Sequence, residues 1–169
     1  MPEGEASYYF DTVTLCNFAL ANRLDLLIAR YGTRVQITPA VLGEVLDGVA
    51  VGYSALQEIE KAVTTDAFAQ AGMLRERERE IFRDLLRTLS PGEASCIACA
   101  QNRGDIVVTD DRAARDCCRE REVRFTGTIG VLKACCRDEI IEPSEADTIL
   151  QAMIDAGYFS PVRNISGLL

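Results

Sequence analysis

The clearest sign of how this chain folds is the run Ile106-Val107-Val108-Thr109-Asp110-Asp111. Three consecutive β-branched apolar residues predict a short strand buried on both faces, as in a parallel sheet, and the polar residues after them mark its end. A helical pattern follows at 113–121, and a second short strand is expected at 123–125. A strand, a helix and a strand in this order predict a unit whose two strands run parallel.

The same alternation extends through the rest of the chain. Short buried strands are expected at 8–10 and 35–37, each followed by an apolar helical pattern. The first pattern runs from Leu15 to Ile28 and ends at Gly32. The second begins at Thr38-Pro39, which supplies an N-cap and a proline at the first helical position. Further helices are predicted at 75–89, from Ser90 to Arg103, from about 129 and from about 144.

These elements predict one α/β domain over residues 1–169, a three-layer α/β/α sandwich around a central, mostly parallel sheet. The pattern at 52–72 is weaker and is interpreted as partly helical. Together with the predicted helix at 75–89, it is expected to form a helical insert over 52–89.

The composition is that of a globular protein. The chain of 169 residues is 48% apolar and 26% charged, and charged residues interrupt every apolar run before membrane length. Its acidic start, Met1 to Glu5, lacks the features of a signal peptide, so we expect a cytoplasmic protein. The net charge of −8 argues against broad adhesion to nucleic acid through a basic surface. It does not exclude a nuclease, because clustered carboxylates can bind cations that contact phosphates.

Seven cysteines agree with a reducing compartment, because their number is odd and two pairs, at 117–118 and 135–136, are adjacent in sequence. The spacing Cys96-x-x-Cys99 is compatible with zinc. However, the chain has no histidine and no second ligand pair at a standard spacing. We therefore interpret 94–100 as a helix of small, packed residues, in which cysteine serves as a small apolar side chain.

Carboxylates follow two of the predicted strands, with Asp11 after the first and Asp110-Asp111 after the strand at 106–108. Parallel strands end at one edge of a sheet, and ligands bind there at the point where the strand order reverses. If the two strands are neighbours, these carboxylates converge. Carboxylates packed together raise one another's pKa unless a cation lies among them, and magnesium and manganese prefer such oxygen ligands.

Two glutamates are placed to reach the same edge. Glu44 lies in the helix after the second strand, about 60° outside its apolar stripe, and Glu93 lies in the first turn of its helix. Each acid also has a structural explanation. Glu93 completes a capping box with Ser90, Asp111 can cap the helix that follows it, and Glu44 can be a solvated surface residue. Asp11 is harder to explain in this way, because an acid at the end of a buried strand needs a partner.

The order of these motifs resembles that of PIN domains. The resemblance runs from about Tyr9 to Leu169 and is greatest to a prokaryotic toxin-like branch of that family. The motifs that carry it are a strand followed by Asp11-Thr12, Thr38-Pro39-x-x-x-x-Glu44-Val45, Gly92-Glu93-Ala94 at the start of a helix, Val107-Val108-Thr109-Asp110-Asp111, the sequence Asp-Asp-Arg-x-x-Arg at Asp110 to Arg115, and Gly127-Thr128-Ile129-Gly130-Val131-Leu132.

This resemblance implies a five-stranded parallel sheet and a ribonuclease dependent on Mg²⁺ or Mn²⁺. The four catalytic acids of the family correspond to Asp11, Glu44, Glu93 and Asp111, and the metal ligands to Asp11, Glu93, Asp110 and Asp111. Many members have aspartate where this chain has Glu93. Prokaryotic members are often toxins neutralised by a small antitoxin protein, and often homodimers. The insert at 52–89 departs from the shortest members.

Thr12 and Thr109 adjoin the acids and are candidates to bind substrate, although a structural hydroxyl is the simpler role. Arg75, Arg77 and Arg79 alternate with glutamates and are expected to form a solvated, ion-paired start of a helix. The alternative is that these arginines line the path of the RNA or contact an acidic antitoxin.

Other functions fit the residues less well. A phosphotransferase of the haloacid-dehalogenase type needs a second aspartate two residues after Asp11, where this chain has Val13. A receiver domain needs a lysine near its acids, and Lys133 lies in a predicted helix instead. The main alternative is a PIN-like binding or regulatory module with little or no catalysis, which the acidic composition favours and the complete acid set disfavours.

Overall fold

The computed structural model describes residues 5–169. Residues 1–4, which belong to the acidic start considered above, lie outside the described residues.

The centre of the described chain is a five-stranded sheet with the order β3-β2-β1-β4-β5, in which every neighbouring pair is parallel. The predicted α/β architecture and the five-stranded parallel sheet are therefore confirmed. The strands at 8–10, 35–37 and 106–108 fall where they were predicted, and the last strand begins one residue later than expected. The bounds are β1 (Tyr8–Phe10), β2 (Val35–Ile37), β3 (Ala69–Gln70), β4 (Ile106–Val108) and β5 (Arg124–Thr126).

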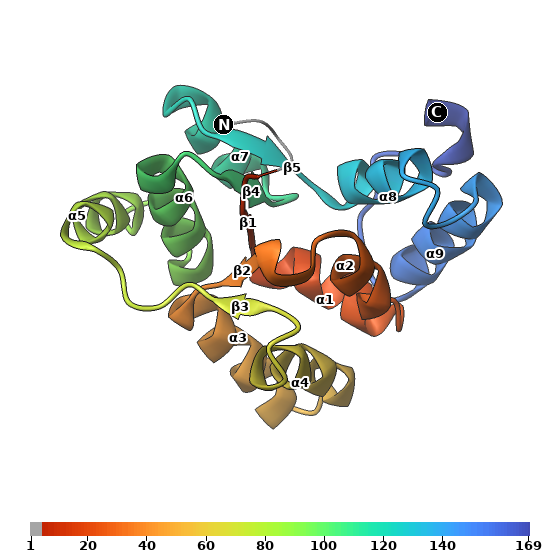
Figure 1. The fold of residues 1–169 in the computed structure, drawn as a ribbon, viewed down its shortest axis with the longest axis horizontal. Coiled ribbons are helices and arrows are strands. Elements are labelled where there is room, and N and C mark those ends of the chain that lie inside the picture. The colour runs from red at the N-terminus through yellow and green to blue at the C-terminus, as the bar shows by residue number, and fades with distance from the viewer. Residues whose placement is uncertain (1–4) are drawn as a thin grey trace.

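Helices cover both faces of this sheet. In Figure 1, α5 and α6 lie on one side of the central strands, and α1, α2, α8 and α9 lie on the other. This is the predicted three-layer arrangement. The helices are α1 (Thr12–Leu20), α2 (Leu24–Arg30), α3 (Pro39–Ala50), α4 (Gln57–Thr64), α5 (Glu76–Leu85), α6 (Pro91–Arg103), α7 (Arg112–Glu120), α8 (Thr128–Arg137) and α9 (Pro143–Asp155), with short 3-10 turns η1 (Gly32–Arg34), η2 (Ser54–Leu56) and η3 (Ser166–Leu168).

The prediction of one continuous helical pattern from Leu15 to Ile28 is wrong. The chain forms two helices, α1 and α2, which meet at a bend of 115°. Between them Asn22 has a φ of +56°, a left-handed conformation that asparagine tolerates better than most residues. In residues 5–169, no helix alone has the length and apolar content to cross a membrane, and α1 and α2 reach that threshold only as this bent pair.

The stretch at 52–89 is not only helical. It contains η2, α4 and α5, but also β3, which pairs with β2 and forms one edge of the sheet. A strand of two residues, one of them exposed, carries too little apolar pattern to be recognised in the sequence.

Glu78 corrects the expectation of a solvated charged start for α5. Its side chain is completely buried and forms an ion pair with Arg103 of α6, with 2.7 Å between Oε2 and Nε. Its neighbour Arg77 behaves as expected, because it forms an exposed ion pair with Glu80. The buried pair joins α5 to α6.

The packed character of α6 is confirmed. Its residues from Ala94 to Ala100 are all buried, including Cys96 and Cys99 at 0% exposure. Small side chains let this helix lie close against β1 and β4, and Gly104 in the left-handed conformation ends it.

Candidate active site

The strand order reverses between β1 and β4. From β1 the chain proceeds to β2 and β3 on one side, and β4 and β5 complete the sheet on the other side. Phe10 and Val108 end these central strands in register, and the backbone N–H of Asp11 donates to the carbonyl of Val108 at 3.0 Å. The predicted neighbourhood of Asp11 and the Asp110-Asp111 pair is thus confirmed, at the edge where such sheets bind ligands.

Asp11 lies deepest in this edge, with 3% of its surface exposed. Its carboxylate accepts hydrogen bonds from the backbone N–H of Thr14 at 2.8 Å and from the hydroxyl of Thr109 at 2.5 Å. No lysine or arginine of residues 5–169 forms an ion pair with it. Burial outweighs these hydrogen bonds and, with the nearby carboxylate of Asp110, raises the pKa of Asp11 to about 6.

Glu44 is brought to this edge by two hydrogen bonds. It accepts from the hydroxyl of Thr12 at 2.6 Å and from the backbone N–H of Gly92 at 2.9 Å. The second contact satisfies one of the free amides at the start of α6. Glycine at position 92 leaves room for this contact, because a Cβ there would lie within 3 Å of the Glu44 carboxyl group.

Glu93 forms the capping box that its sequence context predicts. Its carboxylate accepts from the backbone N–H of Ser90 at 3.2 Å, and its own N–H donates to the Ser90 hydroxyl at 3.3 Å. Partial burial raises the pKa of Glu93, and the carboxylates of Asp111 and Glu44 raise it further, while the contacts to Ser90 oppose the shift. Glu93 therefore shares the electrostatic environment of two other predicted site residues.

The two aspartates after β4 have different surroundings. Asp110 accepts from the backbone N–H and the hydroxyl of Thr128, and Arg115 Nη2 lies 3.6 Å from its Oδ1. Asp111 is exposed and caps α7 by accepting from the N–H of Ala114 at 2.8 Å. Asp110 is thus bound within the fold, and Asp111 faces solvent.

Thr109 and Thr12 act as structural hydroxyls at this edge. Besides donating to Asp11, the Thr109 hydroxyl accepts from the backbone N–H of Asp111 at 3.2 Å. Thr12 donates to Glu44 in the same way. Each threonine therefore orients an acid of the site.

The donor set suits a hard divalent cation, because it consists of carboxylates and includes one buried without a positive partner. In the side-chain positions described for residues 5–169, however, no group of three or more Asp, Glu, Cys or His residues is arranged to hold a metal ion. Glu93 and Asp111 point into cap contacts instead. Both are accessible enough to rotate, and their caps are worth only about 1 kcal/mol each.

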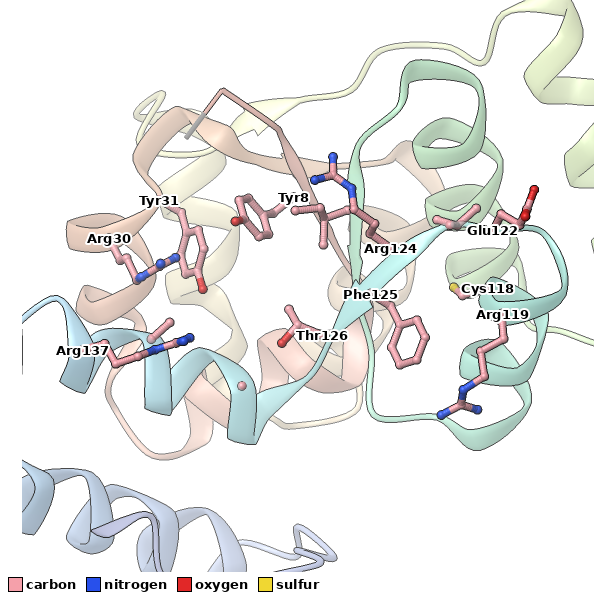
Figure 2. Close-up of a pocket in the computed structure, with 14 residues that line it drawn as sticks. Tyr8, Arg30, Tyr31, Cys118, Arg119, Glu122, Arg124, Phe125, Thr126 and Arg137 are labelled. Atoms are coloured by element: carbon pink, nitrogen blue, oxygen red, sulfur yellow. The ribbon is translucent and has the colours of Figure 1, made fainter. Parts of the chain in front are cut away.

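The cavity in Figure 2, of about 500 Å³, lies elsewhere, beside β5, α7 and α8. It is lined by Arg30, Arg119, Arg124 and Arg137 and by none of the five predicted acids. The predicted site is accordingly an edge of the sheet and not this cavity.

Sequence reasoning assigned no role to the groups that hold Asp110, namely Asn17, Arg115 and Thr128, although two of them lie in motifs quoted above. Asn17 Nδ2 donates to Thr128 Oγ1 at 3.1 Å and lies 3.5 Å from Asp110 Oδ2. Thr128 belongs to the Gly-Thr-Ile-Gly motif noted above, which was the available signal. No pattern in the sequence links it to Asp110.

Comparison with known proteins found similarity to several solved structures. They include PAE2754 from Pyrobaculum aerophilum, at 19% identity and a TM-score of 0.46, and VapBC2 from Rickettsia felis bound to a DNA fragment from their promoter, at 16% identity and a TM-score of 0.49. The similarity covers 66% of this chain and 85% of the first, and 71% of this chain and 97% of the second. None of the curated proteins matches the sequence. A family model described as "DUF3368: PIN domain" matches residues 8–169. The chain therefore belongs to the PIN-domain family.

Proposed function

We propose that this protein is a metal-dependent ribonuclease that hydrolyses RNA phosphodiester bonds at the edge formed by β1 and β4. PIN domains are generally nucleases. The observation that carries the proposal is the burial of Asp11 at the point where the strand order reverses. Asp11 has no ion-pair partner among the described residues, and four further acids lie around the same edge: Glu44, Glu93, Asp110 and Asp111. A fold tolerates such a carboxylate at a cost in stability, and a bound cation would remove that cost.

In this proposal Asp11, Glu93 and Asp111 hold Mg²⁺ or Mn²⁺, with Asp110 alongside as a further candidate ligand. Glu44 holds a second position or acts through water. A bound divalent cation supplies an activated water and stabilises charge on the leaving oxygen. The chain contributes the orientation of the carboxylates, through Thr12 and Thr109.

The test is cleavage of a mixed RNA pool by purified protein with manganese, with and without EDTA. We expect cleavage that EDTA abolishes and that Asp11→Asn eliminates. Asp25→Asn is a matched control, because Asp25 is an exposed acid of α2 that pairs with Arg23 away from the site. Absence of cleavage across a range of divalent metals would contradict the proposal.

The second candidate is a PIN-like binding module with little or no catalysis. One observation favours it: each of the five acids already has a hydrogen-bond partner, and no three of them converge in the described residues. Calorimetry with Mn²⁺ separates the two candidates. A nuclease should bind Mn²⁺ and lose binding in Asp11→Asn, whereas a non-catalytic module should show no heat in either protein.

We further propose, from the family resemblance, that the nuclease is a toxin, a homodimer and the partner of a small antitoxin. A short adjacent reading frame for a DNA-binding protein would support the toxin role. Growth arrest on expression, relieved by co-expression of that frame, would test it.

A further inference from the structure

A second feature adjoins the acids: a groove of about 640 Å³ between α7 and the segment that follows α9. One wall is the face of α7 that carries Arg112, Arg115, Asp116 and Arg119. The other wall is made by Tyr158, Phe159 and Pro161, and Asp110 and Ile129 complete the lining. We call this the α7–tail groove. It is continuous with the candidate active site, because Asp110 lines it and Arg112 directly follows Asp111.

The charges of the groove are mostly compensated within the protein. Asp110 is bound by Thr128, Asp116 pairs with Arg119, and Arg115 donates to the carbonyl of Thr109 at 2.9 Å. Arg112 differs, because it is exposed and forms no hydrogen bond or ion pair with any side chain of residues 5–169. The groove therefore presents one uncompensated guanidinium next to the candidate metal ligands.

The opposite wall presents an aromatic ring to solvent. Phe159 is 98% exposed, more than any other large apolar side chain described. Its neighbour Tyr158 is partly buried, and burial together with the Asp110 carboxylate raises the pKa of Tyr158 to about 12. This wall therefore combines a partly buried tyrosine with an exposed phenylalanine ring that is free to contact a ligand.

Arg115 and Arg119 are held in place by Phe125 of β5. The guanidinium carbons lie 5.4 and 5.1 Å from the ring centroid, which is cation–π distance. Figure 2 shows Arg119 extending from α7 alongside this ring. Two arginines of the α7 wall, Arg115 and Arg119, thus contact a ring of the sheet.

We propose that the α7–tail groove binds a nucleotide of single-stranded RNA adjacent to the cleaved bond, with its base stacked on Phe159 and its phosphate on Arg112. This inference rests on the proposed nuclease function. Proteins bind single-stranded nucleic acid with exposed aromatic rings and with positively charged side chains. The rings stack on the bases, each of which has a π face, and the positive charges contact the phosphate of each linkage. A protein partner is less well matched, since a single exposed ring opposite a wall of charged α7 residues offers little apolar area to bury.

The experiment measures dissociation constants of a short fluorescein-labelled single-stranded RNA by anisotropy, in EDTA so that no cleavage occurs. Phe159→Ala should weaken binding by roughly tenfold, the effect of losing one stacked base. Arg112→Gln should weaken binding and reduce the slope of log K against log salt by about 0.7, the loss of one phosphate contact. Neither side chain forms a hydrogen bond or an ion pair with the part of the chain that the structure describes, so both variants should keep the wild-type melting temperature.

Matched controls are Tyr53→Ala and Arg87→Gln, which remove an exposed aromatic ring and an exposed arginine that do not line the groove. Groove variants that bind RNA like these controls, or wild-type protein that binds no RNA, would overturn the inference. Loss of self-association in Phe159→Ala with unchanged RNA affinity would also overturn it and assign the ring to contacts between copies. Cleavage by wild-type protein in manganese is measured separately, so the nuclease proposal can stand when the groove proposal fails.

Discussion

Asp110 and Thr128 are bound to each other twice, through the backbone N–H of Thr128 at 2.9 Å and through its hydroxyl. These contacts join the end of β4 to the start of α8. A Cβ on the preceding residue, Gly127, would collide with Asp110 and Arg115, so the glycine permits this close approach. Asp110 is therefore held within the fold, whereas its neighbour Asp111 is exposed and is held by its cap contact to Ala114.

The first prediction separates these two acids. Asp111→Asn can still accept from Ala114, so it should keep its melting temperature without metal and lose both metal-induced stabilisation and RNA cleavage. Asp110→Asn weakens hydrogen bonds to a charged group and should cost about 1.5–3 kcal/mol, with a smaller loss of cleavage per folded molecule. Thermal denaturation with and without Mn²⁺, and cleavage assays, measure both. If Asp110→Asn is stable and inactive while Asp111→Asn cleaves RNA normally, the assignment is reversed.

The second prediction concerns the glycine against which Glu44 packs. Alanine at position 92 would place its Cβ 2.8 Å from Glu44 Oε1, so the glutamate must leave its position and its hydrogen bond to the α6 amide. We expect Gly92→Ala to reduce RNA cleavage at least as much as Glu44→Gln.

Gly43→Ala is the matched control for Gly92→Ala. Gly43 precedes Glu44 on α3 and its added Cβ would meet nothing within 4 Å. This variant should retain cleavage and gain up to about 1 kcal/mol in unfolding free energy, the difference between glycine and alanine in a helix. Equal activity in the two variants would show that the position of Glu44 is not required.

The third prediction uses the buried pair of Glu78 and Arg103. Burial raises the pKa of Glu78, but hydrogen bonds from Arg103, the Arg75 backbone and Asn102 outweigh it and lower the pKa from 4.5 to about 2. A lowered folded-state pKa contributes stability above pH 4.5 that is lost as the pH falls toward 2, here on the order of 3 kcal/mol. Urea denaturation as a function of pH should show this loss. Glu78→Gln should be destabilised near neutral pH and nearly insensitive over that acidic range; a parallel decline in both proteins would contradict the prediction.

Much of the fold could be predicted because its strands are short, continuous and apolar. β1 and β4 combine full burial with an abrupt change to polar residues, and that change also located Asp11 and Asp110. β3 could not be found, because its pairing with β2 depends on tertiary contacts and not on pattern. The bend between α1 and α2 was also not predicted. The apolar residues continue on both sides of Asn22, so the pattern does not show that Asn22 adopts a left-handed backbone conformation there.

For the site, sequence predicted which acids reach the edge and which caps they form. It could not predict that Glu44 accepts a hydrogen bond from the backbone N–H of Gly92, 48 positions away. Nor could it predict that Glu78, within the charged run of α5, is buried. Both depend on how α3, α5 and α6 pack together. Helical periodicity describes one helix at a time, so it carries no information on such contacts between helices.

The last prediction tests whether the buried Asp11 is kept for a cation. Its folded-state pKa, about 6, lies above the ordinary value of 3.8. The unfolded chain therefore loses this proton at a lower pH than the folded chain does. Metal-free protein should lose stability on the order of 3 kcal/mol as the pH rises from about 4 to 6.

The variant Asp11→Asn has no charge to desolvate and can still accept a hydrogen bond from the backbone N–H of Thr14. Without metal above pH 7 it should therefore melt higher than wild type, with the difference closing below pH about 4. Mn²⁺ should raise the melting temperature of wild type and leave the variant unchanged, because a carboxylate that costs stability alone should be stabilised by a bound cation. An Asp11→Asn variant that is less stable than wild type at every pH, and a wild type that does not respond to Mn²⁺, would together assign Asp11 to the fold and favour the binding-module alternative.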